Sequence, residues 1–324
     1  MTTISAKTIL RSRNSTAPDK VLSTLLLRYP RPIHSEFMTH RVFSRNAASS
    51  RAIPIKKLID DVVNDPFVPL HWGKNEKGMQ ANEECSDPVF APVPMPFGGP
   101  RLELVQNRGR TNREAWLNAR DLAVMSAKAF AAAGYHKQIV NRLLEPFAHI
   151  TVLVSSTEWD NFLELRDHAD AEPHIQMLAR EVRKCLEDDS TIQLLHPGEW
   201  HLPFVTEEDW AEADAFGRHL ANVFPNKDEP RDADTIAMDN LIKLSTARCA
   251  STSYKTVDGF DMTMERAIAV HDKLVGSRPI HASPAEHVAQ VDKWMEGHDG
   301  GWLYPEQHAN FVGFRQYRHM LPTT

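Results

Sequence analysis

Two apolar runs constrain the fold of this chain most, because each has the length and composition of a β-strand. The run VLSTLLLRY at 21–29 is followed by Pro30 and Pro32, which cannot donate to a strand ladder. The run HITVLV at 149–154 is rich in β-branched residues. Segments with helical spacing surround both runs. The chain therefore predicts an α+β fold, with helices packed around a sheet.

Helices are predicted from their caps and from the spacing of apolar residues. The clearest one begins at a capping box of Thr111 and Glu114 and ends before Gly134. The run Ser155-Ser156-Thr157 is the expected cap of a helix at 159–166. Further helices are expected at 33–41, 56–63, 136–144, 207–223 and 264–274, and another is expected to end at 186.

Length, charge and cysteine usage limit the class of protein. The 324 residues suffice for one or two domains, and the formal net charge of −6 excludes a non-specific nucleic-acid binder. No apolar run approaches the ~20 residues that span a bilayer. Residues 1–20 are polar, carry no secretory signal and are expected to lead loosely into the fold. The three cysteines, Cys85, Cys185 and Cys249, form neither a metal pattern nor a disulfide framework, which predicts a cytoplasmic protein, in the host cytoplasm if it is viral.

The stretch HRVFSRNAASSR at 40–51 carries the strongest chemical signal. It holds one His, three Arg, three Ser and one Asn in twelve residues. Arginine supplies a fixed cationic fork for phosphate or carboxylate, and Ser and Asn supply neutral donors and acceptors. A solvated loop or helix face is the alternative interpretation, because charge runs commonly lie at the surface.

The order of these residues resembles the signature of the flavin-dependent thymidylate synthases, the ThyX family. That signature reads Arg-His-Arg-x-x-Ser-x-Asn-Glu-x-Ser-x-Arg-Tyr. Thr39, Ala47 and Ala52 stand where the family has its first Arg, its Glu and its Tyr. The loop segment 71–80 resembles one in phage-type members. The matching positions are His40, Arg41, Ser44, Asn46, Ser49 and Arg51.

A second block resembles the second half of the family's fold. Arg142 precedes Pro146, and Asn161-Phe162-Leu163-Glu164-Leu165-Arg166 follows the strand at 149–154. The resemblance implies that Arg142 binds the nucleotide phosphate, that Asn161 binds flavin, and that Arg166 binds the pyrimidine and stabilises its negative charge. It also implies nucleotide contacts from Glu36, Ser49 and Arg51, catalytic roles for Ser49 and Arg166, and flavin or folate contacts from His40, Arg41, Ser44 and Asn46.

A third block follows the others here, whereas its counterpart opens the family's chain. It comprises Ser245–Ser251, a helix at 264–274 and the run 277–287. The chain therefore resembles a circular permutation of the ThyX-like fold, in which helices surround an antiparallel sheet. The implied organisation is a core at 1–186, an insertion or linker at 187–235 and a permuted flavin-binding segment with a tail at 236–324. The resemblance places Ser251, Ser283, Glu286 and His287 near flavin, although Ser283 to Glu286 also reads as a plain helix N-cap.

The family's chemistry follows as an expectation. NADPH would reduce FAD, and a one-carbon unit from methylenetetrahydrofolate would reach C5 of deoxyuridylate, giving thymidylate. Family sites lie at subunit interfaces, so a homo-oligomer, a tetramer, is expected. No cysteine nucleophile and no metal site are expected, since no cysteine has Arg/His-rich neighbours and His168 and His174 lack metal-ligand spacing.

The departures from the signature leave alternatives open. Glu36 replaces the family's Gln, and a carboxylate only accepts hydrogen bonds. The product could therefore be hydroxymethylated, and the substrate could be dUMP or dCMP. A non-catalytic flavin- or nucleotide-binding protein and a metal-dependent hydrolase are further alternatives. Arg315 or Arg318 is expected to compensate for the missing arginine at position 39.

Overall fold

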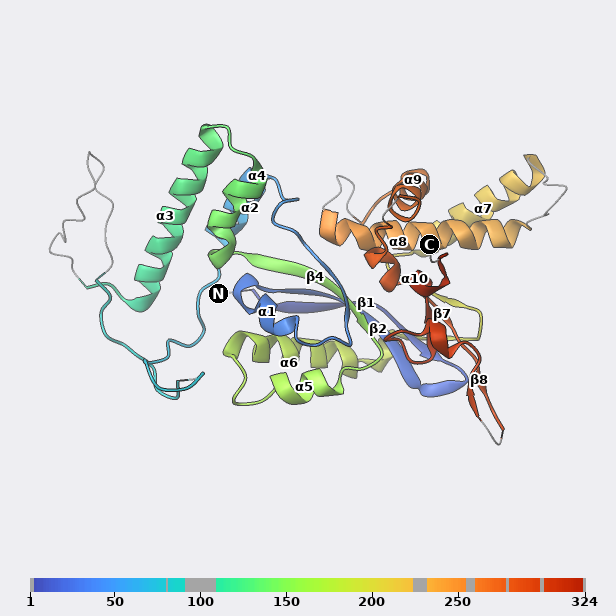
Figure 1. Cartoon of the computed structure of the whole chain (residues 1–324), viewed down its shortest axis with the longest axis horizontal. Coiled ribbons are helices and arrows are strands. Elements are labelled where there is room, and N and C mark those ends of the chain that lie inside the picture. The colour runs from blue at the N-terminus through green and yellow to red at the C-terminus, as the bar shows by residue number, and fades with distance from the viewer. Residues whose placement is uncertain are drawn as a thin grey trace.

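A five-stranded sheet forms the centre of the computed structural model, which describes residues 3–79, 81–90, 109–223, 232–254, 260–277, 280–297 and 300–322 (Figure 1). Its strand order is β3-β4-β2-β1-β5. Neighbouring strands pair antiparallel, except that β5 runs parallel to β1. The architecture is thus α+β. The strands are β1 (Ser5–Asn14), β2 (Ala17–Pro30), β3 (Ser44–Ala47), β4 (His149–Ser156) and β5 (Ile192–Leu195).

Strand β1 corrects the expectation that residues 1–20 lead loosely into the fold. It pairs with β2 along most of its length. Three of its polar side chains, Arg11, Ser12 and Asn14, are buried against distant segments. Arg11 Nη1 donates to the Asp188 carbonyl at 2.8 Å, and Asn14 Nδ2 donates to the carbonyls of Asp292 and Gly313. A strand whose polar groups have such tertiary partners shows no apolar alternation in its sequence.

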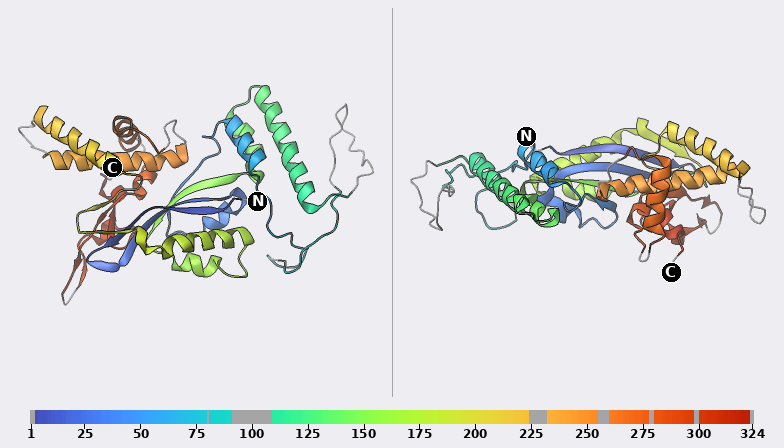
Figure 2. Two further views of the ribbon diagram at one scale, coloured as in Figure 1. Left: turned by 180° about the vertical axis from the view of Figure 1, so that it is seen from behind. Right: turned by 90° about the horizontal axis from the view of Figure 1, so that it is seen from above.

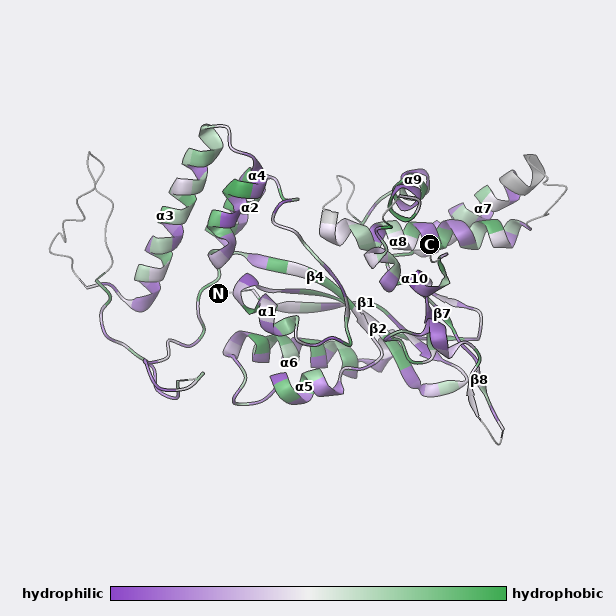
Figure 3. Ribbon diagram, viewed as in Figure 1, coloured by the Kyte–Doolittle hydropathy of each residue, from purple (hydrophilic) through white to green (hydrophobic). Residues whose placement is uncertain are grey.

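One face of the sheet is hydrophobic and is covered by two helices, α5 (Asp160–Arg166) and α6 (Pro173–Glu187) (Figure 1). Both helices alternate hydrophobic and hydrophilic residues along the chain, as amphipathic helices do (Figure 3). The Glu172 side chain caps α6 by accepting from the amides of His174 and Ile175. The core beneath includes Leu25, Leu27, Tyr29, Val152, Val154, Phe162, Ile175, Leu178 and Val182.

Some of the predicted helices form as expected, and others are shorter or divided. The capping box of Thr111 and Glu114 forms, and α3 (Asn112–Ala132) follows it and ends before Gly134, which has φ +86°. The helix expected at 33–41 ends early, as η1 (Arg31–Ile33) and α1 (His34–Phe37). Other predicted helices are confirmed as α2 (Ile55–Asn64), α7 (Glu207–Val223) and α9 (Met264–Val275), whereas 136–144 divides into α4 (Lys137–Val140) and the 3-10 helix η2 (Asn141–Phe147).

The predicted cap at Ser155-Ser156-Thr157 is wrong. Ser155 and Ser156 extend β4, and α5 begins after Trp159 without a side-chain cap. Ser155 pairs with Thr24 and with Ser44 on the neighbouring strands. The Ser155 hydroxyl contacts Thr24 across the sheet, and this contact outweighs the local capping preference of serine.

The C-terminal half packs beside the sheet as a second hydrophobic unit (Figures 1 and 2). Helix α7 lies against α8 (Ala233–Tyr254), and α8 lies against α9. The segment 187–235 contributes β5 to the main sheet and α7 to this helical layer. The smaller elements are η3 (Asp189–Thr191), β6 (Trp200–His201), η4 (Ser283–Glu286), β7 (Ala289–Val291), β8 (Trp294–Met295), β9 (Gly301–Trp302), η5 (Pro305–Gln307), β10 (Phe314–Gln316) and α10 (Tyr317–Met320). None of the helices in the described part of the chain has the length and apolar character required to cross a membrane.

Candidate functional site

Strand β3 distributes the polar signature over two faces of the sheet. Side chains alternate along a strand, so Ser44 and Asn46 share one face and Arg45 and Ala47 share the other. Ser44 Oγ accepts from Gln316 at 3.2 Å, and Asn46 Nδ2 donates to the Cys249 carbonyl at 3.4 Å. Ala47 packs against the hydrophobic core on the opposite face. The sequence did not predict this strand, because its apolar and polar residues alternate poorly.

The first group of candidate residues is centred on Arg166. Its Nε donates to His40 Nε2 at 2.9 Å, and its Nη2 donates to Thr39 Oγ1 at 3.2 Å. Its Nη1 lies 3.7 Å from Glu36 Oε2. Because His40 Nε2 accepts from a guanidinium, the imidazole is neutral with its proton on Nδ1. Burial, together with the charges of Arg166 and Arg45, lowers the pKa of His40 to about 4.

This group borders a cavity of about 900 Å³. Arg166 does not line the cavity but is hydrogen-bonded to Thr39 and His40, which do. Burial and the nearby Glu172 raise the pKa of Glu36 against the opposing effect of Arg166. The cavity combines cationic, acidic, amide and imidazole groups. Its polar lining comprises Arg11, Asp19, Lys20, Ser23, Thr39, His40, Arg41, Thr157, Glu158, Asp160 and Asn161.

The second group lies on the other face of the sheet, where α8 packs against β3, β4 and η4. His287 is fully buried, and its Nδ1 lies 2.9 Å from Ser155 Oγ. Glu286 forms an ion pair with Arg318. Ser251 is buried within α8, where its hydroxyl donates to the Ala247 carbonyl.

The expected N-cap at Ser283 is wrong. The segment Ser283–Glu286 forms a single 3-10 turn, its N-cap residue is Ala282, and no side chain caps it. Ser283 itself is exposed. The turn is too short to have the backbone dipole of a regular helix, so it offers no anion site of that kind.

The third group surrounds Glu145. Ser50 Oγ donates to Glu145 Oε1 at 2.5 Å, and Arg31 Nη2 and Arg142 Nη1 lie 3.4 and 3.9 Å from the same carboxylate. Both arginines line a cavity of about 560 Å³ with Pro32, His34, Ser35, Glu145 and Pro146. Arg142 is largely exposed, at 63% of its side chain. Ser49 is half-buried and Arg51 is exposed beside Ser50.

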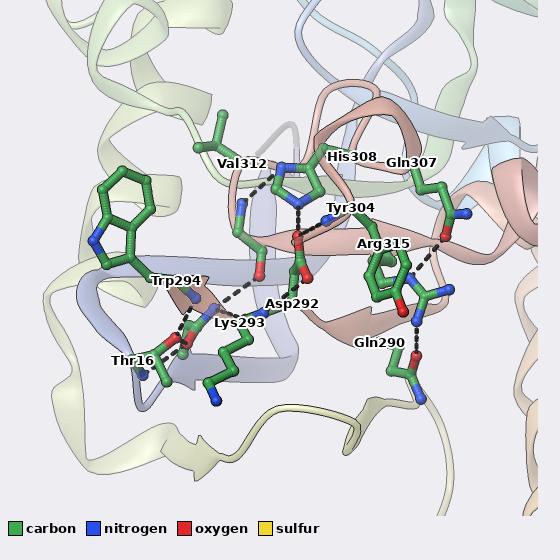
Figure 4. A network of polar contacts seen from close by, with 12 residues as sticks. Thr16, Gln290, Asp292, Lys293, Trp294, Tyr304, Gln307, His308, Val312 and Arg315 are labelled. Carbon is green, nitrogen blue, oxygen red and sulfur yellow. Dashed lines mark hydrogen bonds and ion pairs between the residues drawn. The ribbon is translucent and has the colours of Figure 1, made fainter. Parts of the chain in front are cut away.

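The two tail arginines are both engaged within the chain. Arg315 donates from Nε to Gln307 Oε1 and from Nη1 to Gln290 Oε1, each at 2.7 Å, and lies 4.0 Å from the centre of the Tyr304 ring (Figure 4). Arg318 pairs with Glu286. At position 39, the hydroxyl of Thr39 instead accepts from Arg166.

The three predicted segments come together within one chain. Direct contacts join Arg166 to His40, Ser155 to His287, and Ser50 to Glu145. The structure nevertheless puts Arg142 in a different group from Arg166. The polar residues that sequence analysis missed are isolated in the sequence and gain their neighbours only on folding; they are Ser12, Thr24, Arg31, His201, Asn310 and Gln316.

No protein-family model matches the chain, and no curated protein matches it in sequence. Among solved structures, it is similar to a UMP/dUMP methylase, PolB, from Streptomyces cacaoi bound with 5-Br UMP, with a TM-score of 0.36 and 14% identity over 59% of this chain and 91% of that chain. The PolB complex with 5-Br dUMP is similar with a TM-score of 0.33 and 14% identity, over 55% of this chain and 70% of that chain. The chain is also similar to the flavin-dependent thymidylate synthase ThyX from Helicobacter pylori, complexed with FAD and dUMP. The TM-score is 0.32 and the identity 17%, over 53% of this chain and 74% of that chain. Likenesses at this level assign no function to the chain.

Proposed function

We propose that this protein is an enzyme of pyrimidine nucleotide C5 modification, which uses FAD and NADPH to transfer a one-carbon unit from methylenetetrahydrofolate to dUMP. The observation that carries the proposal is the convergence of three separate polar segments around β3. Arg166 contacts His40, and His287 contacts Ser155, although each pair is more than 120 residues apart in the chain. A solvated charge run would not have these buried partners.

The nucleotide is assigned to the groups around Arg142 and Arg166. Arg31 and Arg142 share one carboxylate, Glu145, so their cavity keeps a net positive charge that suits a phosphate. Glu36, which faces Arg166, follows Arg31 by five residues along a tight helical turn. That turn separates the two positions by roughly 8–10 Å. The span is comparable to that between the phosphate and the base of a nucleotide.

The flavin is assigned to the second group, on the face of the sheet that carries Ser44 and Asn46. Two buried polar atoms there, His287 Nε2 and Thr252 Oγ1, have no hydrogen-bond partner among the described residues. Buried polar groups of folded proteins are normally paired, so both atoms fit a site completed by a polar ligand. Ser44, Asn46, Ser251 and Glu286 would hold the group, which supplies hydride and one-carbon chemistry when bound. Arg41 and Asn161 line the cavity beside His40, apart from this group.

The protein's own part is to bind, orient and stabilise charge. Thr39 and His40 accept hydrogen bonds from Arg166 and thereby hold its guanidinium in one orientation. A fixed cation beside the pyrimidine stabilises negative charge that develops on the ring during attack at C5. Cys249 is fully buried, and burial raises the pKa of its thiol, so it does not serve as a nucleophile.

The same proposal covers the chain's organisation. Residues 236–324 supply η4 and α8 to the face of the sheet that carries Ser44 and Asn46, so they form one unit with the N-terminal half. This supports a circularly permuted ThyX-like arrangement. The exposed Arg51 and Arg142 suit a homotetramer in which neighbouring subunits complete each nucleotide site.

Turnover with each substrate tests the proposal. Purified protein is incubated with FAD, NADPH, labelled methylenetetrahydrofolate and either dUMP or dCMP. The mass of the nucleotide product is then measured by mass spectrometry. The proposal predicts label on dUMP with a mass gain of one methylene group. NADPH-dependent flavin reduction without a labelled nucleotide would contradict it.

One observation favours a cytosine nucleotide as the substrate of the second candidate, a hydroxymethylase. Glu36 is held beside Arg166 and only accepts hydrogen bonds when ionised, so it suits the exocyclic amine of a cytosine. In the same assay, this candidate predicts label on dCMP or a mass gain larger by one oxygen atom. A methylated dUMP product would exclude it.

A further inference from the structure

A row of buried side chains crosses the polar face of the sheet from β5 to η4. Ser12 Oγ lies 2.7 Å from His201 Nδ1, and His201 Nε2 lies 2.8 Å from Thr24 Oγ1. Thr24 Oγ1 lies 2.6 Å from Ser155 Oγ, which lies 2.9 Å from His287 Nδ1. All five residues are fully buried, at 0% exposure. They come from five different elements or their flanks.

One residue at the edge of the sheet sets the direction of these hydrogen bonds. Gln193 Nε2 donates to Ser12 Oγ at 3.1 Å. The Ser12 hydroxyl has one proton, and His201 Nδ1 is its available acceptor. Burial lowers the pKa of His201 to about 3, so the ring is neutral and carries its single proton on Nε2.

The remaining donors then follow one another along the row. His201 Nε2 donates to Thr24, the Thr24 hydroxyl donates to Ser155, and the Ser155 hydroxyl donates to His287 Nδ1. His287 therefore carries its proton on Nε2. In the opposite direction, Ser12 would accept hydrogen bonds from both His201 and Gln193. Its own hydroxyl proton would then have no acceptor among these contacts.

The end of the row is a donor without an acceptor. His287 Nε2 is buried and has no hydrogen-bond partner among the residues that the structure describes. Leaving a buried donor unpaired costs about 1–3 kcal/mol, so the fold maintains this N–H against its own stability. A ligand atom that accepts a hydrogen bond would remove the cost.

We infer that Gln193 and His201 are positioning residues that fix His287 as the Nε2–H tautomer, and that this N–H donates to an acceptor atom of a bound heterocycle. Only the identity of that heterocycle, the flavin, rests on the proposed function. The tautomer is a property of the chain by itself. His287 accordingly acts as a hydrogen-bond donor and not as a base.

A single charge substitution at the surface tests this inference. In Gln193→Glu the new carboxylate only accepts, so the Ser12 hydroxyl turns toward it and every donor in the row reverses. His287 would then carry its proton on Nδ1. Long-range 1H–15N correlation spectra of protein labelled with 15N-histidine distinguish the two tautomers, and His287→Gln identifies the signal.

The matched control is Gln176→Glu, an equivalent substitution at a helical glutamine whose amide donates to the exposed His168 carbonyl. We expect Nε2–H in the wild type and in the control, and Nδ1–H in Gln193→Glu. A wild-type Nδ1–H signal, or an unchanged tautomer in Gln193→Glu, would overturn the inference. Thr24→Val breaks the row inside the fold and is expected to give a mixture of both tautomers.

Flavin titrations separate this inference from the proposed function. If the tautomer reverses in Gln193→Glu, the Kd for FAD is expected to rise about tenfold, while Gln176→Glu keeps the wild-type value. A reversed tautomer with unchanged FAD affinity overturns the donor role of His287. A wild type that binds no FAD refutes the proposed function, and the tautomer experiment still decides how the row is polarised.

Discussion

The guanidinium of Arg166 is held by three neighbours that come from one tight turn. His40 accepts a hydrogen bond from Nε of Arg166, Thr39 accepts one from its Nη2, and the carboxylate of Glu36 lies near its Nη1. Its side chain remains 20% exposed, and its partners Thr39 and His40 line the neighbouring cavity. A planar fork held in this way suits a planar anion better than a flexible ammonium does.

Replacing Arg166 with lysine tests that role. Lysine keeps the charge but loses the fork and the bond to His40, so kcat/KM for the pyrimidine nucleotide is expected to fall by about 10²–10³. The control is Arg180→Lys, which alters an exposed ion pair with Asp167 and should leave kcat/KM unchanged. Steady-state kinetics with equal loss in both variants, or in neither, would count against a specific role of Arg166.

Contiguous residues of the site could be predicted from the sequence, and scattered ones could not. His40, Ser44 and Asn46 stand within one short stretch, so their types and spacing are visible before folding. Thr24 and His201 are single polar residues in unrelated segments, and their contact spans 177 positions. Such a pair becomes meaningful only once the strands are aligned.

At the scale of elements, local signals succeeded where a helix end is exposed and failed where side chains serve tertiary contacts. Thr111 and Glu114 form the predicted capping box at the surface, where nothing competes with it. Ser155 was predicted as a cap but bonds across the sheet to Thr24 and His287. Long-range pairing thus overrode the local preference of serine.

The cap of α3 gives a prediction with an internal control. Thr111→Ala removes the bond from the Glu114 amide and is expected to lower the free energy of unfolding by about 1 kcal/mol. Thr263 is the N-cap residue of α9 but makes no side-chain capping bond, so Thr263→Ala should cost much less. Urea unfolding of both variants checks this. Equal losses would show that capping is not the cause.

Helices α7 and α8 are joined by a buried ion pair. Arg248 Nη2 donates to Asp209 Oδ1 at 2.9 Å, and its guanidinium also reaches the carbonyls of Phe204 and Met262. Arg248→Met leaves a buried carboxylate without its partner and is expected to destabilise the fold by about 3–5 kcal/mol. The exposed pair of Arg218 with Asp214 is the matched case, where Arg218→Met should cost no more than about 1 kcal/mol. Chemical denaturation measures the free energy of unfolding of both variants. Similar losses in the two would contradict a stabilising role of the buried pair of Arg248 with Asp209.

In the whole molecule, the two halves meet through polar contacts and through a small hydrophobic cluster of Leu22 with Ala289, Val291, Phe311 and Phe314, and not through one continuous hydrophobic core. The hydrophobic clusters on α5–α6 and on α7–α9 are separate. Between them lies the buried polar face of the sheet, with Ser44, Asn46 and His287. The general α+β class followed from strand and helix patterns, but this internal polar layer did not, since each strand contributes only one or two of its residues.

Buried neutral histidines make the whole fold sensitive to acid. Burial is the leading cause that lowers the pKa of His40 and His149 to about 4, and of His201 and His287 to about 3. Unfolded histidines have a pKa near 6.5, so below that pH the unfolded state binds more protons than the folded state. Stability is therefore fully present above about pH 6.5 and is lost progressively as the pH falls toward 4 and 3.

Urea midpoints at pH 7 and pH 5 check this dependence. The midpoint should fall markedly at the lower pH, with net proton uptake on unfolding. Neither ring nitrogen of His149 has a hydrogen-bond partner among the described residues, and Nδ1 lies 3.9 Å from Asp65 Oδ2, so His149→Phe should remove about one proton of that uptake. A midpoint that is flat between the two pH values would refute the assignment of neutral buried histidines.

Equilibrium binding of FAD, followed by its visible absorbance with and without dUMP, tests whether this chain binds a flavin together with a pyrimidine nucleotide. Segments 40–51, 142–166 and 281–287 are proposed to meet because they form one site for a flavin and a pyrimidine nucleotide. We expect saturable binding with one FAD per chain, tighter when dUMP is present. Absence of saturable binding under both conditions would contradict it.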